Sequence, residues 1–210
     1  MSSDAIVIHT PTTAPTGLLL MAHGVGASAD DLVPLGRFVA QALPNWQVVS
    51  LNAPDASDFG QGRQWFSVMG VTEANRAARV DQALPAFAAL VAQQQAEAGV
   101  GADRTVLLGF SQGSIMSLAS TQAPTALAQR VIAIAGRFAQ PPHQAPLNGG
   151  AVHLLHGDQD TVIPAQCSRD AAAQLQALSA PATLDLFPGL GHGVDARVAH
   201  RVVALLQAEG

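Results

Sequence analysis

The chain has 210 residues, of which 49% are hydrophobic and 12% are charged. This length and balance exclude a disordered protein and predict one domain, residues 1–210, with a sizeable core. The net charge is −5 and the ten basic residues, all arginines, form no cluster, which excludes a nucleic-acid partner.

Neither a leader nor a membrane segment is predicted. Residues 1–10 carry no basic residue ahead of an apolar run, as a signal peptide would. The apolar run at residues 17–22 is far shorter than the ~20 residues that span a bilayer. The only cysteine, Cys167, excludes an internal disulfide framework and a cysteine-based zinc site. We therefore expect a cytoplasmic protein without a membrane span, as a monomer or a homodimer.

Short apolar runs alternate with stretches of helical spacing along the chain. The predicted strands are residues 5–9, 17–22, 46–51, 104–110, 130–135, 151–155 and 183–187. The predicted helices are residues 30–43, 73–98, 112–121, 164–178 and 194–208. Repeated strand–helix units predict an α/β protein with a mostly parallel central sheet and helices on both faces. In such sheets, ligands bind at the carboxyl ends of the strands.

The helix predicted at residues 73–98 contains Pro85. Proline has no amide hydrogen and clashes with the preceding turn, at a cost of ~3 kcal/mol inside a regular helix. We therefore expect a kink or a break at Pro85.

A serine lies between a predicted strand and a predicted helix. Residues 109–113 read Gly-Phe-Ser-Gln-Gly and match the nucleophile elbow pattern G-x-S-x-G. The strand runs straight into this pattern and the helix runs straight out of it, which is the context that holds the serine on a sharp turn, clear of the sheet. We predict that Ser111 is a nucleophile.

A serine hydroxyl becomes a good nucleophile only beside a base, which an acid in turn orients. His192 lies in a glycine-rich loop after the last predicted strand and is the predicted base. Residues 156–160, His-Gly-Asp-Gln-Asp, follow the strand before it and supply the acid. Asp158 and Asp160 both qualify, although Asp158 could instead hydrogen-bond its own turn.

The same segment admits a metal-site alternative with His153, His156, Asp158 and Asp160 as ligands. Positions 153 and 156 are three apart on a predicted strand, so their side chains should point to opposite faces. The helical zinc pattern H-E-x-x-H is also absent. We therefore predict no metal.

Ester cleavage places negative charge on the carbonyl oxygen, and backbone amides are the usual stabilising donors. One donor should be the amide of Gln112, the residue after the nucleophile. The other should come from residues 23–26, His-Gly-Val-Gly, and we nominate the amide of Val25. His23 is expected to brace this loop.

Residues 52–72 have no predicted element, and long loops of this kind are often functional. We predict that Trp65, Phe66 and Met69 wall an acyl pocket. The alternative is that these side chains simply pack the loop onto the core.

Over nearly its whole length the chain resembles the bacterial branch of the carboxylesterase/phospholipase family, which includes the acyl-protein thioesterases. The resemblance rests on residues 23–26, 62–68, 109–113, 156–160 and 191–192. It implies an α/β-hydrolase fold without a large lid domain, a Ser111–Asp160–His192 triad, and an oxyanion hole at Val25 and Gln112.

The resemblance also implies an activity: cleavage of small acyl esters, acyl thioesters or lysophospholipids through an acyl-enzyme, without a cofactor. It favours Asp160 because the second aspartate of the segment carries the acid role in the family. The alternative is a non-catalytic binding protein of the same fold. Such a protein would be expected to lack a triad member, and none is missing here.

Overall fold

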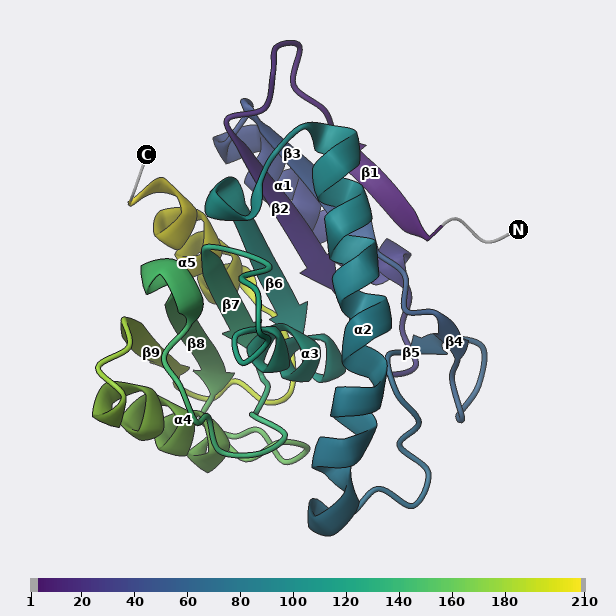
Figure 1. Cartoon of the computed structure of the whole chain (residues 1–210), viewed down its shortest axis with the longest axis vertical. Coiled ribbons are helices and arrows are strands. Elements are labelled where there is room, and N and C mark those ends of the chain that lie inside the picture. The colour runs from purple at the N-terminus through teal and green to yellow at the C-terminus, as the bar shows by residue number, and fades with distance from the viewer. Residues whose placement is uncertain (1–3, 209–210) are drawn as a thin grey trace.

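The computed structural model describes residues 4–208, and its centre is a seven-stranded sheet (Figure 1). The strand order is β1-β3-β2-β6-β7-β8-β9, and every neighbouring pair is parallel except β1 with β3. The strands are β1 Ala5–His9, β2 Gly17–Ala22, β3 Trp46–Leu51, β6 Thr105–Phe110, β7 Arg130–Ile134, β8 Ala151–Gly157 and β9 Ala182–Phe187. The predicted mostly parallel sheet is confirmed, with β1 as its antiparallel edge strand.

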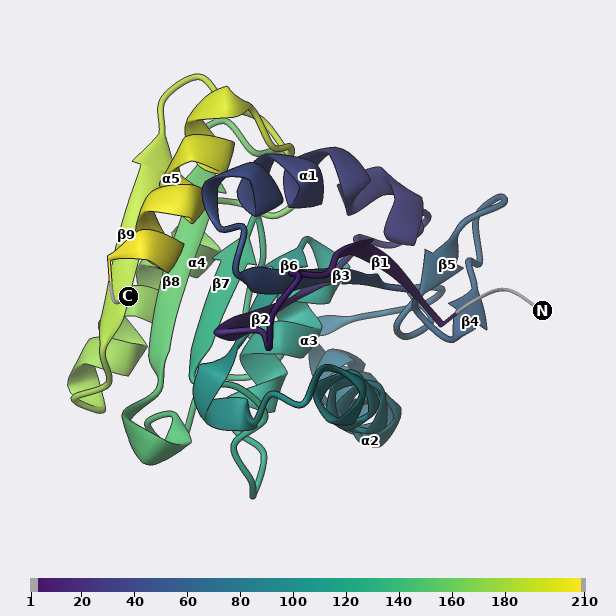
Figure 2. The same ribbon diagram turned by 90° about the horizontal axis from the view of Figure 1, so that it is seen from above.

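Helices cover both faces of the sheet, as predicted. The α-helices are α1 Val33–Ala42, α2 Glu73–Ala98, α3 Gln112–Ser120, α4 Gln166–Ala177 and α5 Ala196–Gln207. Figure 2 shows α1 and α5 on one face of the sheet and α2, α3 and α4 on the other. None of the helices within residues 4–208 combines the length and the apolar character that crossing a membrane requires.

The central strands are buried on both faces because apolar side chains follow one another without alternation. In β2, Leu18 and Leu20 belong to the core cluster that contains residues of α2, α3 and α4. Leu19 and Met21 belong to the cluster that contains residues of α1 and α5. Burial on both faces is typical of parallel sheets. It leaves the carboxyl edge of the sheet as the place for a site.

Two predicted helices differ from the observed ones. α2 is continuous through Pro85, so of the expected kink or break the break is wrong. Pro85 and Asp81 are exposed, and water can therefore satisfy the Asp81 carbonyl that loses its helical partner. The helix predicted at residues 30–43 begins as a 3-10 turn, η1 Ala29–Leu32, and becomes α1 only at Val33. Pro34 has no amide hydrogen to donate to residue 30, so regular α-helical bonding starts after it.

The loop at residues 52–72 has structure of its own. Two short strands, β4 Asp55–Ala56 and β5 Arg63–Gln64, pair in antiparallel fashion. The backbone of Arg63 also exchanges two hydrogen bonds with the loop that follows β2. The Arg63 amide donates to Ala27 O at 2.8 Å, and the Gly26 amide donates to Arg63 O at 2.9 Å. This pairing fixes the loop beside the carboxyl end of β2.

Candidate active site

Ser111 occupies the sharp turn between β6 and α3. Its backbone angles, φ 52° and ψ −114°, lie outside the regions that residues with a side chain normally adopt. The Ser111 amide donates to Ile134 O at 3.0 Å, and the Ser111 carbonyl accepts from the Ile115 amide at 3.1 Å. These bonds hold the turn on both sides. Strained backbone of this kind costs ~1–3 kcal/mol and clusters at functional sites.

The glycines of the elbow let α3 dock tightly on the sheet. A Cβ atom on Gly113 would lie 2.0 Å from Ala22 O in the neighbouring strand β2. A Cβ atom on Gly109 would lie 2.4 Å from Gly113 O. Both distances are far below van der Waals contact, so no side chain fits at either position. The elbow pattern therefore reflects the close approach of three backbone segments around Ser111.

The side chains of Ser111, His192 and Asp160 form one chain of hydrogen bonds. His192 Nε2 lies 2.9 Å from Ser111 Oγ, and His192 Nδ1 lies 2.7 Å from Asp160 Oδ2. A carboxylate can only accept, so Nδ1 carries the imidazole proton and Nε2 can accept the serine proton. The Asp160 side chain is fully buried, whereas that of His192 is 17% exposed. The chain thus runs from the interior to the edge of solvent.

Asp160 is ionised in this environment. Burial by itself would raise the pKa of the Asp160 carboxyl, but hydrogen bonds to the carboxylate from His192, Ile163 and Val162 outweigh it and lower the pKa below its usual value. The Val162 and Ile163 amides donate to Oδ1 at 2.8 and 2.9 Å, which leaves Oδ2 for His192. A charged, fixed carboxylate therefore holds the imidazole in one orientation.

The second aspartate of the segment has a different partner. Asp158 Oδ1 accepts the Gly189 amide at 2.7 Å, across the sheet edge from its own loop. This bond ties the loop after β8 to the turn after β9. Asp160, and not Asp158, is the aspartate that contacts His192.

The two histidines of β8 point to opposite faces of the sheet. His153 Nδ1 lies 2.8 Å from Thr183 Oγ1 on the neighbouring strand. His156 Nδ1 lies 2.7 Å from the hydroxyl of Ser168 in α4. Among residues 4–208, no group of three or more histidine, cysteine, aspartate or glutamate side chains has the arrangement of a metal site.

Val25 and Gln112, the residues predicted to form the oxyanion hole, both lie next in sequence to residues at the Ser111 turn. Gln112 begins α3 directly after Ser111, and Val25 lies in the loop after β2, next to Gly24. A Cβ atom on Gly24 would lie 3.3 Å from Ser111 Cβ, so this loop touches the elbow. No hydrogen bond within residues 4–208 uses the backbone amide of Val25 or of Gln112. Both donors remain available for a negatively charged oxygen.

Two residues of the loop at 52–72, Trp65 and Phe66, pack in the core beneath the Ser111 turn. Trp65 and Phe66 are 2% and 6% exposed and belong to the core cluster beneath α2 and α3. The Gln112 side chain joins their backbones, since its Oε1 accepts the Trp65 amide at 2.8 Å and its Nε2 donates to Phe66 O at 2.7 Å. The Trp65 indole donates to His23 O at 2.9 Å. Met69 is 60% exposed and lies apart from these contacts.

His23 braces the loop that carries Val25. It is fully buried, its Nδ1 lies 2.7 Å from Gly24 O, and its Nε2 accepts the Ala53 amide at 3.1 Å. Burial lowers the pKa of the His23 ring, because the charged form is poorly solvated there. The neutral ring thus joins the loop after β2 to the loop after β3.

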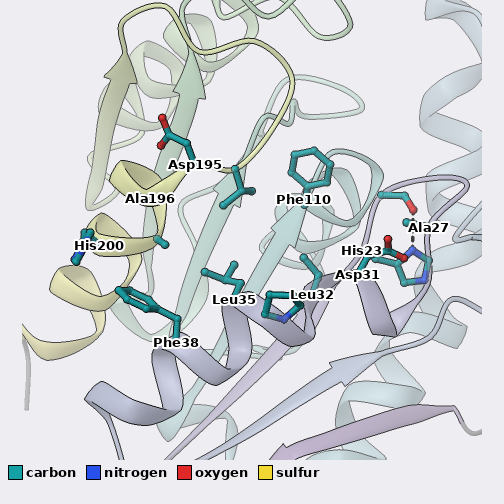
Figure 3. A pocket seen from close by; sticks show the side chains of 14 residues that line it. His23, Ala27, Asp31, Leu32, Leu35, Phe38, Phe110, Asp195, Ala196 and His200 are labelled. Atoms are coloured by element: carbon teal, nitrogen blue, oxygen red, sulfur yellow. Dashed lines mark hydrogen bonds between the residues drawn. The ribbon is translucent and has the colours of Figure 1, made fainter.

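An apolar groove opens beside the elbow, between α1 and α5 (Figure 3). It has a volume of about 530 Å³, and we call it the α1–α5 groove. Its lining includes Gly24, Leu32, Leu35, Phe38, Phe110 and Ala199. Trp65, Phe66 and Met69 are not among the lining residues. Helical spacing in the sequence predicts a buried face that includes Leu32 and Leu35, but spacing alone does not reveal that part of this face stays open.

Comparisons with known proteins agree with this geometry. A model of the phospholipase/carboxylesterase family matches residues 3–208. Esterase YpfH of Escherichia coli (strain K12) is 42% identical over 197 residues, covering 94% of this chain and 84% of that protein. Acyl-protein thioesterase 1 of Kluyveromyces lactis is 27% identical over 193 residues, covering 81% of each chain.

Solved structures show the same fold. The crystal structure of esterase PE8 matches with a TM-score of 0.88 and 29% identity, covering 98% of each chain. The Bacillus cereus carboxylesterase matches with a TM-score of 0.82 at 15% identity, covering 97% of this chain and 93% of that one, and shows the fold alone.

These findings define an α/β hydrolase without a large extra domain. The chain belongs to the phospholipase/carboxylesterase family, as its sequence motifs predicted, and it is an ester hydrolase.

Proposed function

We propose that this protein hydrolyses carboxylic esters through a Ser111–His192–Asp160 triad and an acyl-enzyme intermediate. The observation that carries the proposal is the continuous hydrogen-bond chain from Asp160 Oδ2 through His192 to Ser111 Oγ, at 2.7 and 2.9 Å. Its order and geometry match the roles of orienting acid, base and nucleophile.

In the first half-reaction, Ser111 Oγ forms a bond to the carbonyl carbon of the ester while His192 Nε2 takes the hydroxyl proton. The carbonyl oxygen becomes an oxyanion, which the amides of Val25 and Gln112 stabilise. The bond to the leaving oxygen then breaks, and His192 returns its proton to that oxygen. The products are a free alcohol and an acyl group on Ser111.

In the second half-reaction, water takes the place of the alcohol. His192 removes a proton from water, the hydroxide oxygen bonds to the acyl carbon, and a second oxyanion forms between Val25 and Gln112. Its collapse breaks the bond to Ser111 Oγ, which recovers its proton from His192. The carboxylic acid leaves, and the enzyme returns to its starting state.

The proposed substrates are small acyl esters, acyl thioesters or lysophospholipids. The relatives support this range, since Esterase YpfH and the K. lactis acyl-protein thioesterase are named for ester and thioester cleavage. A non-catalytic binding role is the weaker alternative, because a binding protein has no need to keep Ser111 strained beside an aligned imidazole. The single domain, the cytoplasmic location and the monomeric or homodimeric state stay predictions from the sequence.

A fluorophosphonate probe tests the nucleophile. The wild-type protein should be labelled once, and Ser111→Ala should lose both labelling and hydrolysis of a short-chain p-nitrophenyl ester while keeping its fold. Ser117→Ala is the matched control, since the Ser117 hydroxyl lies in α3 and donates to Gly113 O inside the helix. Labelling or hydrolysis that persists in Ser111→Ala would overturn the mechanism.

Dialysis against EDTA tests the rival metal mechanism. Ester hydrolysis should survive the treatment, because no step above uses a metal ion. Loss of activity that zinc restores would show that the segment at residues 153–160 holds a metal.

A further inference from the structure

The α1–α5 groove adjoins the turn that carries Ser111, although neither Ser111 nor His192 is among its lining residues. A Cβ atom on Gly24 would lie 3.2 Å from Phe110 Cδ1 and 3.3 Å from Ser111 Cβ, so the lining residue Gly24 lies next to Ser111. The Phe110 ring also lies 5.1 Å from the His192 ring, centre to centre. A molecule that is bonded to Ser111 would therefore have the groove as a neighbouring apolar space.

The groove has the size and chemistry of a ligand site. Its volume of about 530 Å³ lies within the ~300–1,000 Å³ of small-molecule pockets. Figure 3 shows Leu32, Leu35 and Phe38 along its length, between His23 at one end and His200 at the other. These side chains offer a continuous apolar wall.

We propose that the α1–α5 groove binds the acyl chain of the substrate, and that this chain is an uncharged alkyl chain of medium length. The proposal rests on the proposed function, because it assumes that Ser111 becomes acylated. The acyl group stays bonded to Ser111 through both half-reactions, whereas the alcohol departs and water must replace it. An apolar groove that lies beside Ser111 suits the group that stays.

The groove disfavours a chain that carries a carboxylate. The residues that line it include Asp31 and Asp195 but no arginine, and the chain contains no lysine. Asp31 accepts the Ser28 amide at 2.8 Å, and Asp195 pairs with Arg197 at 2.7 Å. A carboxylate on the acyl chain would lose its water among leucine and phenylalanine side chains, and the lining offers it no arginine, only the imidazoles of His23 and His200.

The far end of the groove sets the chain length. The rings of Phe38 in α1 and His200 in α5 meet edge to face, with centres 5.0 Å apart. Figure 3 places this pair at the end of the groove away from His23. Chains that reach the pair should bind best, and longer chains should have to displace it or turn into solvent.

A series of p-nitrophenyl esters from acetate to dodecanoate tests the proposal. kcat/KM should rise with acyl length by up to about fourfold per methylene, which corresponds to ~0.8 kcal/mol per buried methylene. It should reach a maximum at a medium chain length and fall for longer chains. Ala199→Phe should move the maximum to shorter chains, and Phe38→Ala should move it to longer ones. Ala89→Phe, on the exposed side of α2, is the matched control and should leave the maximum in place.

The charge requirement has its own comparison. The p-nitrophenyl monoester of suberic acid matches the octanoate ester in length but ends in a carboxylate. The kcat/KM of the suberate ester should be lower than that of the octanoate ester by roughly tenfold or more, because the carboxylate must be desolvated. Equal or faster hydrolysis of the suberate ester would overturn the assignment of an uncharged chain.

Other results would assign the groove differently. If Ala199→Phe alters the length dependence of acetate esters of C2–C8 alcohols and not that of the acyl series, the groove binds the leaving group. If Ala199→Phe changes the oligomeric state of the protein in solution and leaves both series unchanged, a second copy of the chain covers the groove. If acetate hydrolysis survives Ser111→Ala, the proposed function fails first, whatever the chain-length profile.

Discussion

His156 Nε2 lies close to the same oxygen of Asp160 that accepts from His192. Its Nε2 lies 3.2 Å from Asp160 Oδ2 and 2.8 Å from Ile163 O, while its Nδ1 lies 2.7 Å from Ser168 Oγ. A carbonyl can only accept, so Nε2 carries the proton and donates it to Ile163 O, beside Asp160 Oδ2. The side chains of His156 and Asp160 are both fully buried. We therefore expect His156 to position Asp160 and the Ile163 backbone behind the proposed triad.

Removing this support should slow the chemical steps. We expect His156→Gln to lower kcat by roughly tenfold with little change in KM, since the loss of one buried hydrogen-bond partner costs ~1–3 kcal/mol and the substrate does not touch His156. Steady-state kinetics with a soluble short-chain ester and the rate of fluorophosphonate labelling measure the effect. His153→Gln is the control, because His153 lies on the same strand but faces the other side. A purely structural role would show as equal losses in both variants, in step with their melting temperatures.

The two aspartates of the segment should differ strongly in effect. Asp160→Asn removes the charged acceptor that fixes His192 and should lower kcat by about 10⁴, the size of the effect in a serine protease triad. Asp158→Asn replaces an oxygen that accepts only the Gly189 amide, and an asparagine carbonyl can still accept that bond. Its kcat should therefore stay near the wild-type value. The reverse ranking of the two kcat values would move the orienting role to Asp158.

The Gln112 side chain should be needed to hold the loop at residues 52–72. Gln112→Leu would leave the Trp65 amide and the Phe66 carbonyl without their partner, and each buried unpaired group costs ~1–3 kcal/mol. We expect a lower free energy of unfolding in urea together with lower kcat/KM. Gln122→Leu is the control: Gln122 bonds the backbone at residues 143 and 144, away from Ser111, and its loss should destabilise without slowing hydrolysis. Unchanged kcat/KM in Gln112→Leu would show that anchoring of this loop does not affect hydrolysis.

Burial of neutral His23 should make the fold sensitive to acid. Its pKa is lower in the folded protein than its ordinary 6.5, so between these two values the unfolded chain binds a proton that the folded chain does not. Stability is therefore lost as the pH falls below about 6.5. The melting temperature should drop between pH 7 and pH 5, and the drop should be smaller in His23→Gln. Equal drops in the two proteins would show that His23 does not contribute.

The sequence predicted the arrangement of the site better than its surroundings. Ser111, Asp160 and His192 each follow a strand of one parallel sheet, and the carboxyl ends of parallel strands lie at one edge. Strand order along the chain was therefore enough to expect them together. The choice of Asp160 over Asp158 needed more, since both residues lie in the same short loop. It came partly from the family resemblance and partly from the expectation that Asp158 bonds its own turn, whereas Asp158 accepts the Gly189 amide of the turn after β9.

The α1–α5 groove could not be predicted in the same way. Its walls come from helices that are about 160 residues apart in sequence, and whether Phe38 and Ala199 touch or leave a gap depends on how α1 and α5 pack. The composition of the loop at residues 52–72 was equally ambiguous, because aromatic side chains can line a pocket or fill a core. The sequence also did not show that the helix continues through Pro85. That depends on exposure of the Pro85 face, which lets water satisfy the Asp81 carbonyl.

The strained turn at Ser111 serves the proposed hydrolysis but lowers the stability of the fold. Ser111→Gly and Ser111→Ala both remove the hydroxyl, but only glycine adopts φ 52° and ψ −114° without a Cβ penalty. The glycine variant should be more stable than the alanine variant by ~1 kcal/mol, measurable by urea unfolding. If so, directed evolution that screens only for heat tolerance would enrich inactive proteins at this position. Thermostable versions of this enzyme would have to gain their stability elsewhere and keep the unfavourable backbone of Ser111.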